Sequence, residues 1–159
     1  MEVLSLATEQ FRNLSDAEIA FGPRINVLFG DNAQGKTNLI EAIWLFSGAK
    51  SFRGSKDNEM IAFGAETTSL TLRFRDNQRE QTAKIQFGGK DKKKVWMNKV
   101  PLESQRKLAG SFYAVVFAPA HLSIISEGPK NRRKFLDSAI SQINPQYADY
   151  LNRYEKVLL

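Results

Sequence analysis

One segment limits the choice of fold more than any other: a glycine-rich octapeptide that lies between two apolar stretches. It reads Gly30-Asp31-Asn32-Ala33-Gln34-Gly35-Lys36-Thr37 and matches the phosphate-loop pattern G-x-x-x-x-G-K-[ST]. The continuous apolar run over residues 25–29 that precedes it is typical of a strand buried on both faces. The apolar residues that follow recur at helical spacing as far as Gly48. A strand, a phosphate loop and a helix in this order predict an α/β fold.

Each part of this loop has a chemical role in holding a triphosphate. Gly30 and Gly35 allow backbone torsions that other residues resist, so successive N–H groups can turn toward an anion. The helix that begins near Lys36 directs the positive end of its dipole at the same place. Lys36 is expected to reach the β- and γ-phosphates, and the Thr37 hydroxyl is expected to hold Mg²⁺. The sequence therefore predicts a site for ATP with Mg²⁺ at residues 30–37.

Other parts of a hydrolytic site are missing from the sequence. Hydrolases with this loop need an acidic residue at the end of an apolar strand, which holds Mg²⁺ and helps to orient water. A second apolar run at residues 113–117 is followed by Ala118 and Pro119, and Asp137 lies in a stretch with helical spacing. The guanine-reading pattern Asn-Lys-x-Asp is also absent. We therefore expect triphosphate binding without efficient hydrolysis, and we assign no catalytic residue.

The remaining segments predict an antiparallel meander and a helical region. Strands are expected in a hairpin over about residues 2–21 and at 67–74, 81–87, 95–97 and 113–117. Asn98-Lys99 is expected to turn the chain into one more hairpin. From Pro129 onward the apolar residues recur at helical spacing, with an interruption at Pro145. The last residues carry no Gly, Asn or Pro stop, so we expect the chain to end inside a helix.

Composition narrows the class of protein. Hydrophobic residues make up 42% of the 159 residues and charged residues 25%, which is usual for a globular domain. The absence of cysteine excludes disulfides and cysteine metal sites. There is neither a signal peptide nor an apolar run of about 20 residues. We expect a soluble cytoplasmic protein without a membrane partner.

The net charge of +6 is concentrated in two clusters. Eight Lys and Arg residues stand against two acidic residues between Lys84 and Lys107. Lys130, Arg132, Arg133 and Lys134 form the second cluster. Clustered cations favour a polyanionic partner, and nucleic acid before a membrane, although a solvated surface explains the charge equally well.

Five motifs spread along the chain match one family of proteins. They are Phe11-Arg12-Asn13-Leu14, Gly30–Asn38 with its helix, Ser51-Phe52-Arg53, Val116–Pro119, and Gly128–Asp137. Together they resemble the RecF family, in the SMC-like branch of ABC-type ATPases. The resemblance runs through nearly the whole chain and corresponds to the N-terminal part of such a protein. It departs from the family pattern at Ala33, where glycine is usual.

The resemblance implies the first lobe of an ABC-type ATPase head at residues 1–128 and the truncated start of a helical arm at residues 129–159. The implied function is ATP-dependent DNA binding in recombinational repair, DNA replication and the SOS response. The implied partners are gapped, single- or double-stranded DNA, a second copy in an ATP-dependent homodimer, and recombination mediators such as RecR.

The resemblance also extends the set of candidate site residues. Arg12, Asn13 and Asn38 join the nucleotide site, although a surface role for Arg12 and Asn13 stays open. The candidates for DNA contact are Arg53, Lys92, Lys93, Lys94, Arg132 and Arg133. Arg53 has a salt bridge as its alternative, and the arginine pair has capping of the preceding loop.

Two other classes of function remain open. The first is a small P-loop phosphotransferase or GTPase, for which no base-reading or acceptor site is visible. The second is a DNA-binding module whose phosphate loop is vestigial. ATP binding by the chain would separate this second class from an ATP-dependent protein.

Overall fold

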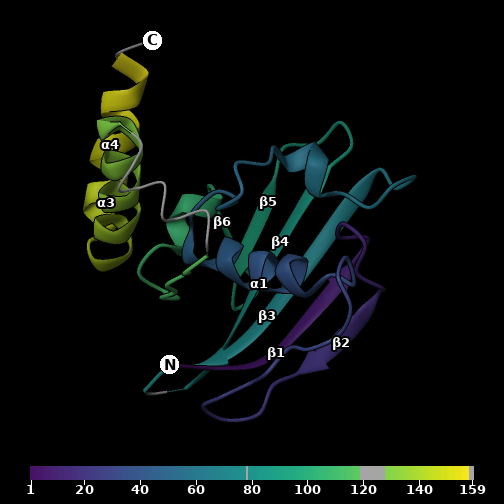
Figure 1. The fold of residues 1–159 in the computed structure, drawn as a ribbon. Helices are drawn as coiled ribbons and strands as arrows, with labels where there is room; N and C mark the ends of the chain where they lie inside the picture. Colours follow the sequence, from purple (N-terminus) through teal and green to yellow (C-terminus); the bar gives the residue numbers. More distant parts are fainter. Residues whose placement is uncertain (78, 119–127, 158–159) are drawn as a thin grey trace.

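The main layer of the fold is one antiparallel sheet with strand order β2-β1-β3-β4-β5-β6 (Figure 1). The structure is a computed structural model and describes residues 1–77, 79–118 and 128–157. The strands are β1 (Glu2–Glu9), β2 (Ala17–Ala20), β3 (Thr67–Arg75), β4 (Glu80–Gly88), β5 (Lys94–Met97) and β6 (Val100–Leu102). The predicted N-terminal hairpin, the meander and the turn at Asn98-Lys99 are therefore confirmed.

Alternation along the strands decides which face of the sheet is buried. In β3, Leu70, Leu72 and Phe74 are buried, whereas Arg73 and Arg75 between and beyond them are exposed. This is the period of two that a pleated strand imposes on its side chains. The register places Leu72 between Leu6 of β1 and Ala83 of β4, so neighbouring strands present their apolar residues to the same side.

Helix α1 (Lys36–Trp44) and the 3₁₀ turn η1 (Leu45–Ser47) cover this apolar face (Figure 1). Four of their side chains, Leu39, Ala42, Leu45 and Phe46, share one core with the buried residues of β1, β3, β4 and β5. Burying a large side chain in this way stabilises the fold by about 1.5–3 kcal/mol. Helix α1 continues directly into η1, and this helical stretch ends as predicted at Gly48, whose φ is +82° and whose added Cβ would lie 2.8 Å from the Ala109 nitrogen.

The helical region forms a hairpin beside the sheet (Figure 1). It consists of α3 (Pro129–Ile143) and α4 (Pro145–Val157), with the predicted break before Pro145. Among the contacts that attach it to the segment after the sheet, which begins with the 3₁₀ turn η3 (Gln105–Leu108), are an ion pair and a hydrogen bond. Lys107 pairs with Asp149 at 2.9 Å, and the Ala114 N–H donates to Gln142 Oε1 at 2.8 Å. None of the described helices is long and apolar enough to cross a membrane.

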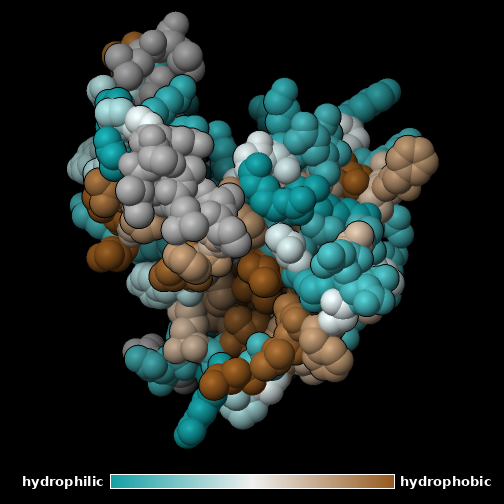
Figure 2. All heavy atoms as spheres, in the orientation of Figure 1, coloured by the Kyte–Doolittle hydropathy of each residue, from teal (hydrophilic) through white to brown (hydrophobic). Residues whose placement is uncertain are grey.

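The two predicted buried strands at residues 25–29 and 113–117 are wrong. Neither segment is a strand, and several of their apolar side chains face outward: Ile25 is 84% exposed, Phe29 90% and Val115 93%. A strand buried on both faces needs hydrogen-bonded neighbours and two covering layers. The described residues supply neither around these segments. Figure 2 shows apolar side chains gathered near the centre and lower edge of the face on which α1 lies.

Candidate nucleotide-binding site

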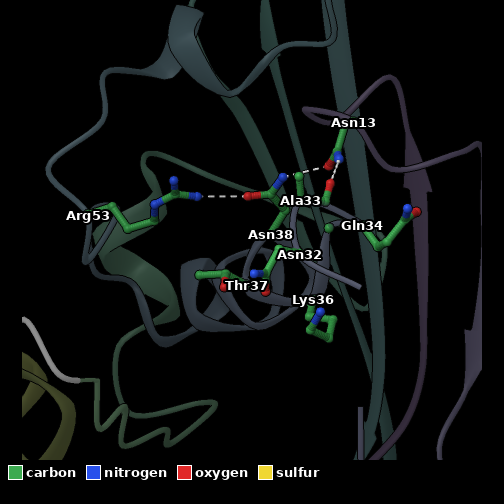
Figure 3. Close-up of a pocket in the computed structure, with 9 residues that line it drawn as sticks. Asn13, Asn32, Ala33, Gln34, Lys36, Thr37, Asn38 and Arg53 are labelled. Carbon is green, nitrogen blue, oxygen red and sulfur yellow. Dashed lines mark hydrogen bonds between the residues drawn. The ribbon is translucent and has the colours of Figure 1, made fainter. Parts of the chain in front are cut away.

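The phosphate loop forms one wall of a pocket of about 360 Å³ at the N-terminal end of α1 (Figure 3). The lining residues come from three separate stretches of the chain. They are Asn13, Asn32, Ala33, Gln34, Gly35, Lys36, Thr37, Asn38 and Arg53. Gly30 and Asp31 lie outside this lining set, but their main-chain carbonyls contact the Lys36 side chain.

The loop depends on backbone conformations that favour glycine. Gly30, Ala33 and Gly35 have φ angles of +139°, +66° and +93°. A Cβ on Gly35 would lie 2.7 Å from Leu14 Cδ2 and 3.0 Å from Asn13 Oδ1, so this position also needs the smallest residue. Ala33 adopts the left-handed conformation at a cost of about 1–2 kcal/mol. That strain gives a physical reason for the glycine that the resemblance led us to expect at this position.

The Lys36 ammonium is held within the loop itself. Its Nζ donates to the Gly30 carbonyl at 2.7 Å and to the Asp31 carbonyl at 2.5 Å. These neutral acceptors place a cation beside the N-terminus of α1, where the helix dipole also attracts negative charge. A phosphate in the pocket would be a stronger, charged acceptor for the same ammonium group.

A chain of hydrogen bonds ties the loop to the segment after α1 (Figure 3). Asn13 Nδ2 donates to the Ala33 carbonyl at 2.7 Å, and Asn38 Nδ2 donates to Asn13 Oδ1 at 2.6 Å. The Arg53 guanidinium then donates to Asn38 Oδ1 at 2.8 Å. Asn13 and Asn38 thus lie at the pocket, where the resemblance placed them. Arg53 also lines the pocket, and its guanidinium lies 3.8 Å from the Glu41 carboxylate, so the salt bridge that was the alternative to DNA contact is present.

The structure does not bring Arg12 into the pocket. Its guanidinium forms a two-pronged ion pair with the buried Glu41 carboxylate, at 2.6 and 3.1 Å, and also donates to Ser55 Oγ and the Glu59 carbonyl. These contacts use the planar fork of the guanidinium inside the protein. The sequence alone could not predict this location of Arg12, because only the folded chain brings a buried carboxylate within its reach.

Glu41 is the important residue that sequence reasoning missed. It is a fully buried charged residue on α1, and such residues are rare unless they are paired. The one feature of the sequence that could have indicated its burial is its position near Leu39 and Ala42 on a helix with an apolar face. That signal does not identify its partners, which lie 29 residues earlier in the chain at Arg12 and 10 residues later at Ser51.

The pocket offers little protein ligation to a metal ion. Thr37 lines the pocket and its hydroxyl suits Mg²⁺, but no Asp, Glu or His belongs to the lining set. Across residues 1–77, 79–118 and 128–157, no group of three His, Asp or Glu side chains could hold a metal ion. The residues present therefore fit Mg²⁺ that is bound mainly by phosphate oxygens and water, with Thr37 as the protein ligand.

The lysines predicted to contact DNA do not form one free patch. Lys93 donates to Asp57 and to Gln105, both at 2.7 Å, and lies 4.6 Å from the Phe87 ring centre. Lys94 pairs with Asp91 and thereby lowers the pKa of that carboxyl. Lys92 is exposed. Lys93 is therefore engaged in contacts within the protein rather than being free to meet DNA.

Arg132 and Arg133 are exposed near the start of α3, whose first turn contains no acidic residue. Cations near the N-terminus of a helix oppose its dipole, so their placement does not help the helix. This arrangement offers two arginine side chains to an external anion. The other reading, in which they cap the preceding loop, concerns residues 119–127 and lies outside the described residues.

Comparison with known proteins identifies the class of domain to which this fold and its phosphate pocket belong. An AAA-domain family model matches residues 5–156, and the chain belongs to this family. The SMC head domain from Thermotoga maritima shares the fold, with a TM-score of 0.57 and 24% identity over 71% of this chain and 43% of that one.

Much closer similarity points to one kind of protein within this class. The DNA replication and repair protein RecF of Clostridioides difficile (strain 630) is 41% identical over 99% of this chain. A solved structure of the recombination mediator protein RecF-ATP in the RecFOR pathway aligns over 98% of this chain, with a TM-score of 0.93 and 36% identity. The chain spans 42% of the length of each. The expected resemblance to RecF and the expected fold class are confirmed.

Proposed function

We propose that this chain binds ATP with Mg²⁺ and acts as the nucleotide-binding lobe of a RecF-like DNA repair protein. The observation that carries the proposal is the pocket at the start of α1, which is lined by residues 32–38 of the phosphate loop and helix, including Lys36, and by Asn13 and Arg53. Such a set of donors suits a polyphosphate. The solved relative described with ATP supports the choice of nucleotide.

Titration calorimetry with ATP and Mg²⁺ tests this proposal directly. We expect saturable binding of ATP, and GTP serves as the comparison because the sequence lacks the guanine-reading pattern. Equal or tighter binding of GTP would favour the small GTPase. Absence of binding by either nucleotide, in a protein that still binds DNA, would favour the module with a vestigial loop.

The DNA-binding part of the proposal rests on charge and on relatives. The net charge is +6, and exposed cations lie in the β4–β5 turn and at the start of α3. We further propose residues 1–128 as the lobe, residues 129–159 as the start of a helical arm, and ATP-dependent dimerisation of the whole protein. Mediator proteins such as RecR are proposed partners in the cytoplasm, because a relative is described in the RecFOR pathway.

DNA affinity is expected to fall steeply with salt, and charge reversal at Lys92, Arg132 and Arg133 is expected to reduce the slope. Each lost phosphate contact should lower the slope of log affinity against log salt by about 0.9 on duplex DNA and about 0.7 on a single strand. Fluorescence anisotropy with a gapped duplex measures both quantities.

The control for that experiment is Lys99→Glu, which makes the same charge change at an exposed lysine in the β5–β6 turn. The loss of DNA binding free energy in the triple variant should be more than three times the loss in this control. Lys93 is left intact because its contacts with Asp57 and Gln105 would confuse stability with binding. Unchanged affinity in the triple variant would remove these residues from the DNA interface.

Phosphate release from bound ATP is expected to stay below about 1 s⁻¹, the low end of ordinary enzyme rates. The reason is that the lining of the pocket contains no carboxylate to hold Mg²⁺ or to orient water. A coupled assay for inorganic phosphate, with Lys36→Ala as the blank, measures this rate. Faster turnover that depends on Lys36 would show that the chain has a complete active site.

A further inference from the structure

The Glu41 carboxylate pairs with two arginines, Arg12 and Arg53, and Arg53 lines the phosphate pocket. We propose that Glu41 is a positioning residue for triphosphate binding, which acts by fixing Arg53 at the pocket. This inference rests on the proposed ATP site. It assigns a binding role to a buried acidic side chain that does not itself line the pocket.

The first step is the burial and saturation of the carboxylate. Glu41 is 0% exposed, and both of its oxygens accept hydrogen bonds from Arg12, whose side chain is 15% exposed. Ser51 Oγ donates to the same carboxylate. A buried charge is tolerated when a partner and further hydrogen bonds satisfy it, as here. Arg12 alone would provide the neutralising charge, so the remaining contacts need a separate explanation.

Those remaining contacts all lead to the turn that carries Arg53. Ser51 Oγ accepts from the Arg53 N–H at 3.1 Å and from the Ser55 N–H at 3.3 Å. The Arg53 guanidinium lies 3.8 Å from Glu41 Oε2, and its side chain is still 44% exposed. Glu41 therefore anchors both the backbone of this turn and the charged end of its arginine. The guanidinium remains partly free toward the pocket.

Helix α1 provides a second contact for the Arg53 guanidinium, through Asn38. Asn38 precedes Glu41 by three residues and therefore lies on the same helical face. Its Oδ1 accepts from Arg53, and its amide leads through Asn13 to the carbonyl of the strained Ala33. Arg53 is thus held between the carboxylate and the phosphate loop. Fixing a long arginine side chain at two points costs rotamer freedom, so we infer that the position of the Arg53 guanidinium matters for binding.

A role limited to stability makes a different prediction from a positioning role. If Glu41 only neutralises Arg12, its loss should affect ATP binding in the same way whether or not Arg53 is present. If Glu41 acts through Arg53, removal of Arg53 should remove most of its influence. A double-mutant cycle distinguishes the two, because interacting residues give non-additive changes.

The experiment measures the Kd for ATP with Mg²⁺ by calorimetry in four proteins: the unchanged chain, Glu41→Gln, Arg53→Ala and the double variant. We expect Arg53→Ala to weaken binding about tenfold through loss of one charge-assisted contact. Glu41→Gln should weaken it about fivefold alone, and by less than twofold in the Arg53→Ala background. Thermal unfolding without nucleotide reports any loss of stability separately.

Additive effects of the two substitutions would overturn the inference, as would an unchanged Kd in Glu41→Gln. If Glu41→Gln does not unfold cooperatively, Ser51→Ala takes its place in the same cycle, since Ser51 Oγ links Glu41 to the Arg53 backbone. The same two outcomes then apply. If the unchanged chain binds no ATP, the proposed function fails instead, so the two failures are distinguishable.

Discussion

Replacing Lys36 with alanine is expected to weaken ATP binding by about 10- to 150-fold. The ammonium group now donates to the Gly30 and Asp31 carbonyls, and we expect it to move to phosphate oxygens when the triphosphate binds. Loss of one charge-assisted contact costs about 1.5–3 kcal/mol, which corresponds to that range. Calorimetry with ATP and Mg²⁺ gives the ratio of the two Kd values.

The matched control for this variant is Lys50→Ala. Lys50 is exposed, follows the same helix and does not line the pocket, so its loss removes an equal charge elsewhere on the molecule. Circular dichroism should show the same fold and the same unfolding midpoint for both variants, because the phosphate loop is largely exposed. An ATP affinity that is equal in the Lys36 and Lys50 variants would contradict the phosphate-loop assignment.

Replacing Arg12 with alanine is expected to lower the free energy of unfolding by about 3–5 kcal/mol. The substitution leaves the fully buried Glu41 carboxylate without its two-pronged partner, and an unpaired buried charge costs about this much. The positive φ of Arg12, +50°, does not alter this expectation, because arginine and alanine both carry a Cβ and are strained alike there. Urea denaturation of both proteins measures the difference.

A second arginine provides the comparison for that experiment. Arg75, like Arg12, forms ion pairs with carboxylates. Its partners are Glu80 and Glu2, and all three of these side chains lie near the surface. Solvent screening makes such pairs weak, so Arg75→Ala should leave the denaturation midpoint nearly unchanged. A stable Arg12→Ala protein with weakened ATP binding would instead support the nucleotide role that the sequence suggested for Arg12.

Local patterns in the sequence were sufficient for most of the secondary structure. The helix after Lys36 was predicted from apolar residues at a period near 3.6, and the meander from short strand-like runs separated by turn residues. Both patterns reflect the apolar face that each element presents to the core, at Leu39 and Ala42 on the helix and at Leu70 and Leu72 on β3. The chemistry of the phosphate loop was equally visible, because the order of its glycines, lysine and threonine is local.

Features that depend on a distant partner could not be decided in this way. The apolar runs at residues 25–29 and 113–117 have the composition of buried strands, but a strand also needs neighbours, and the described residues offer none there. Lys93 looked like a free cation until the fold placed Asp57 and Gln105 beside it.

The phosphate pocket shows the same division between local pattern and tertiary contact. Residues 30–37 identified themselves by their order in the chain, and that order predicted the anion-binding loop. The roles of Arg12, Glu41 and Arg53 followed only from tertiary contacts across 10 to 47 residues of sequence. Ion pairs and hydrogen bonds act over a few ångströms, and only the folded chain determines which charged groups come that close.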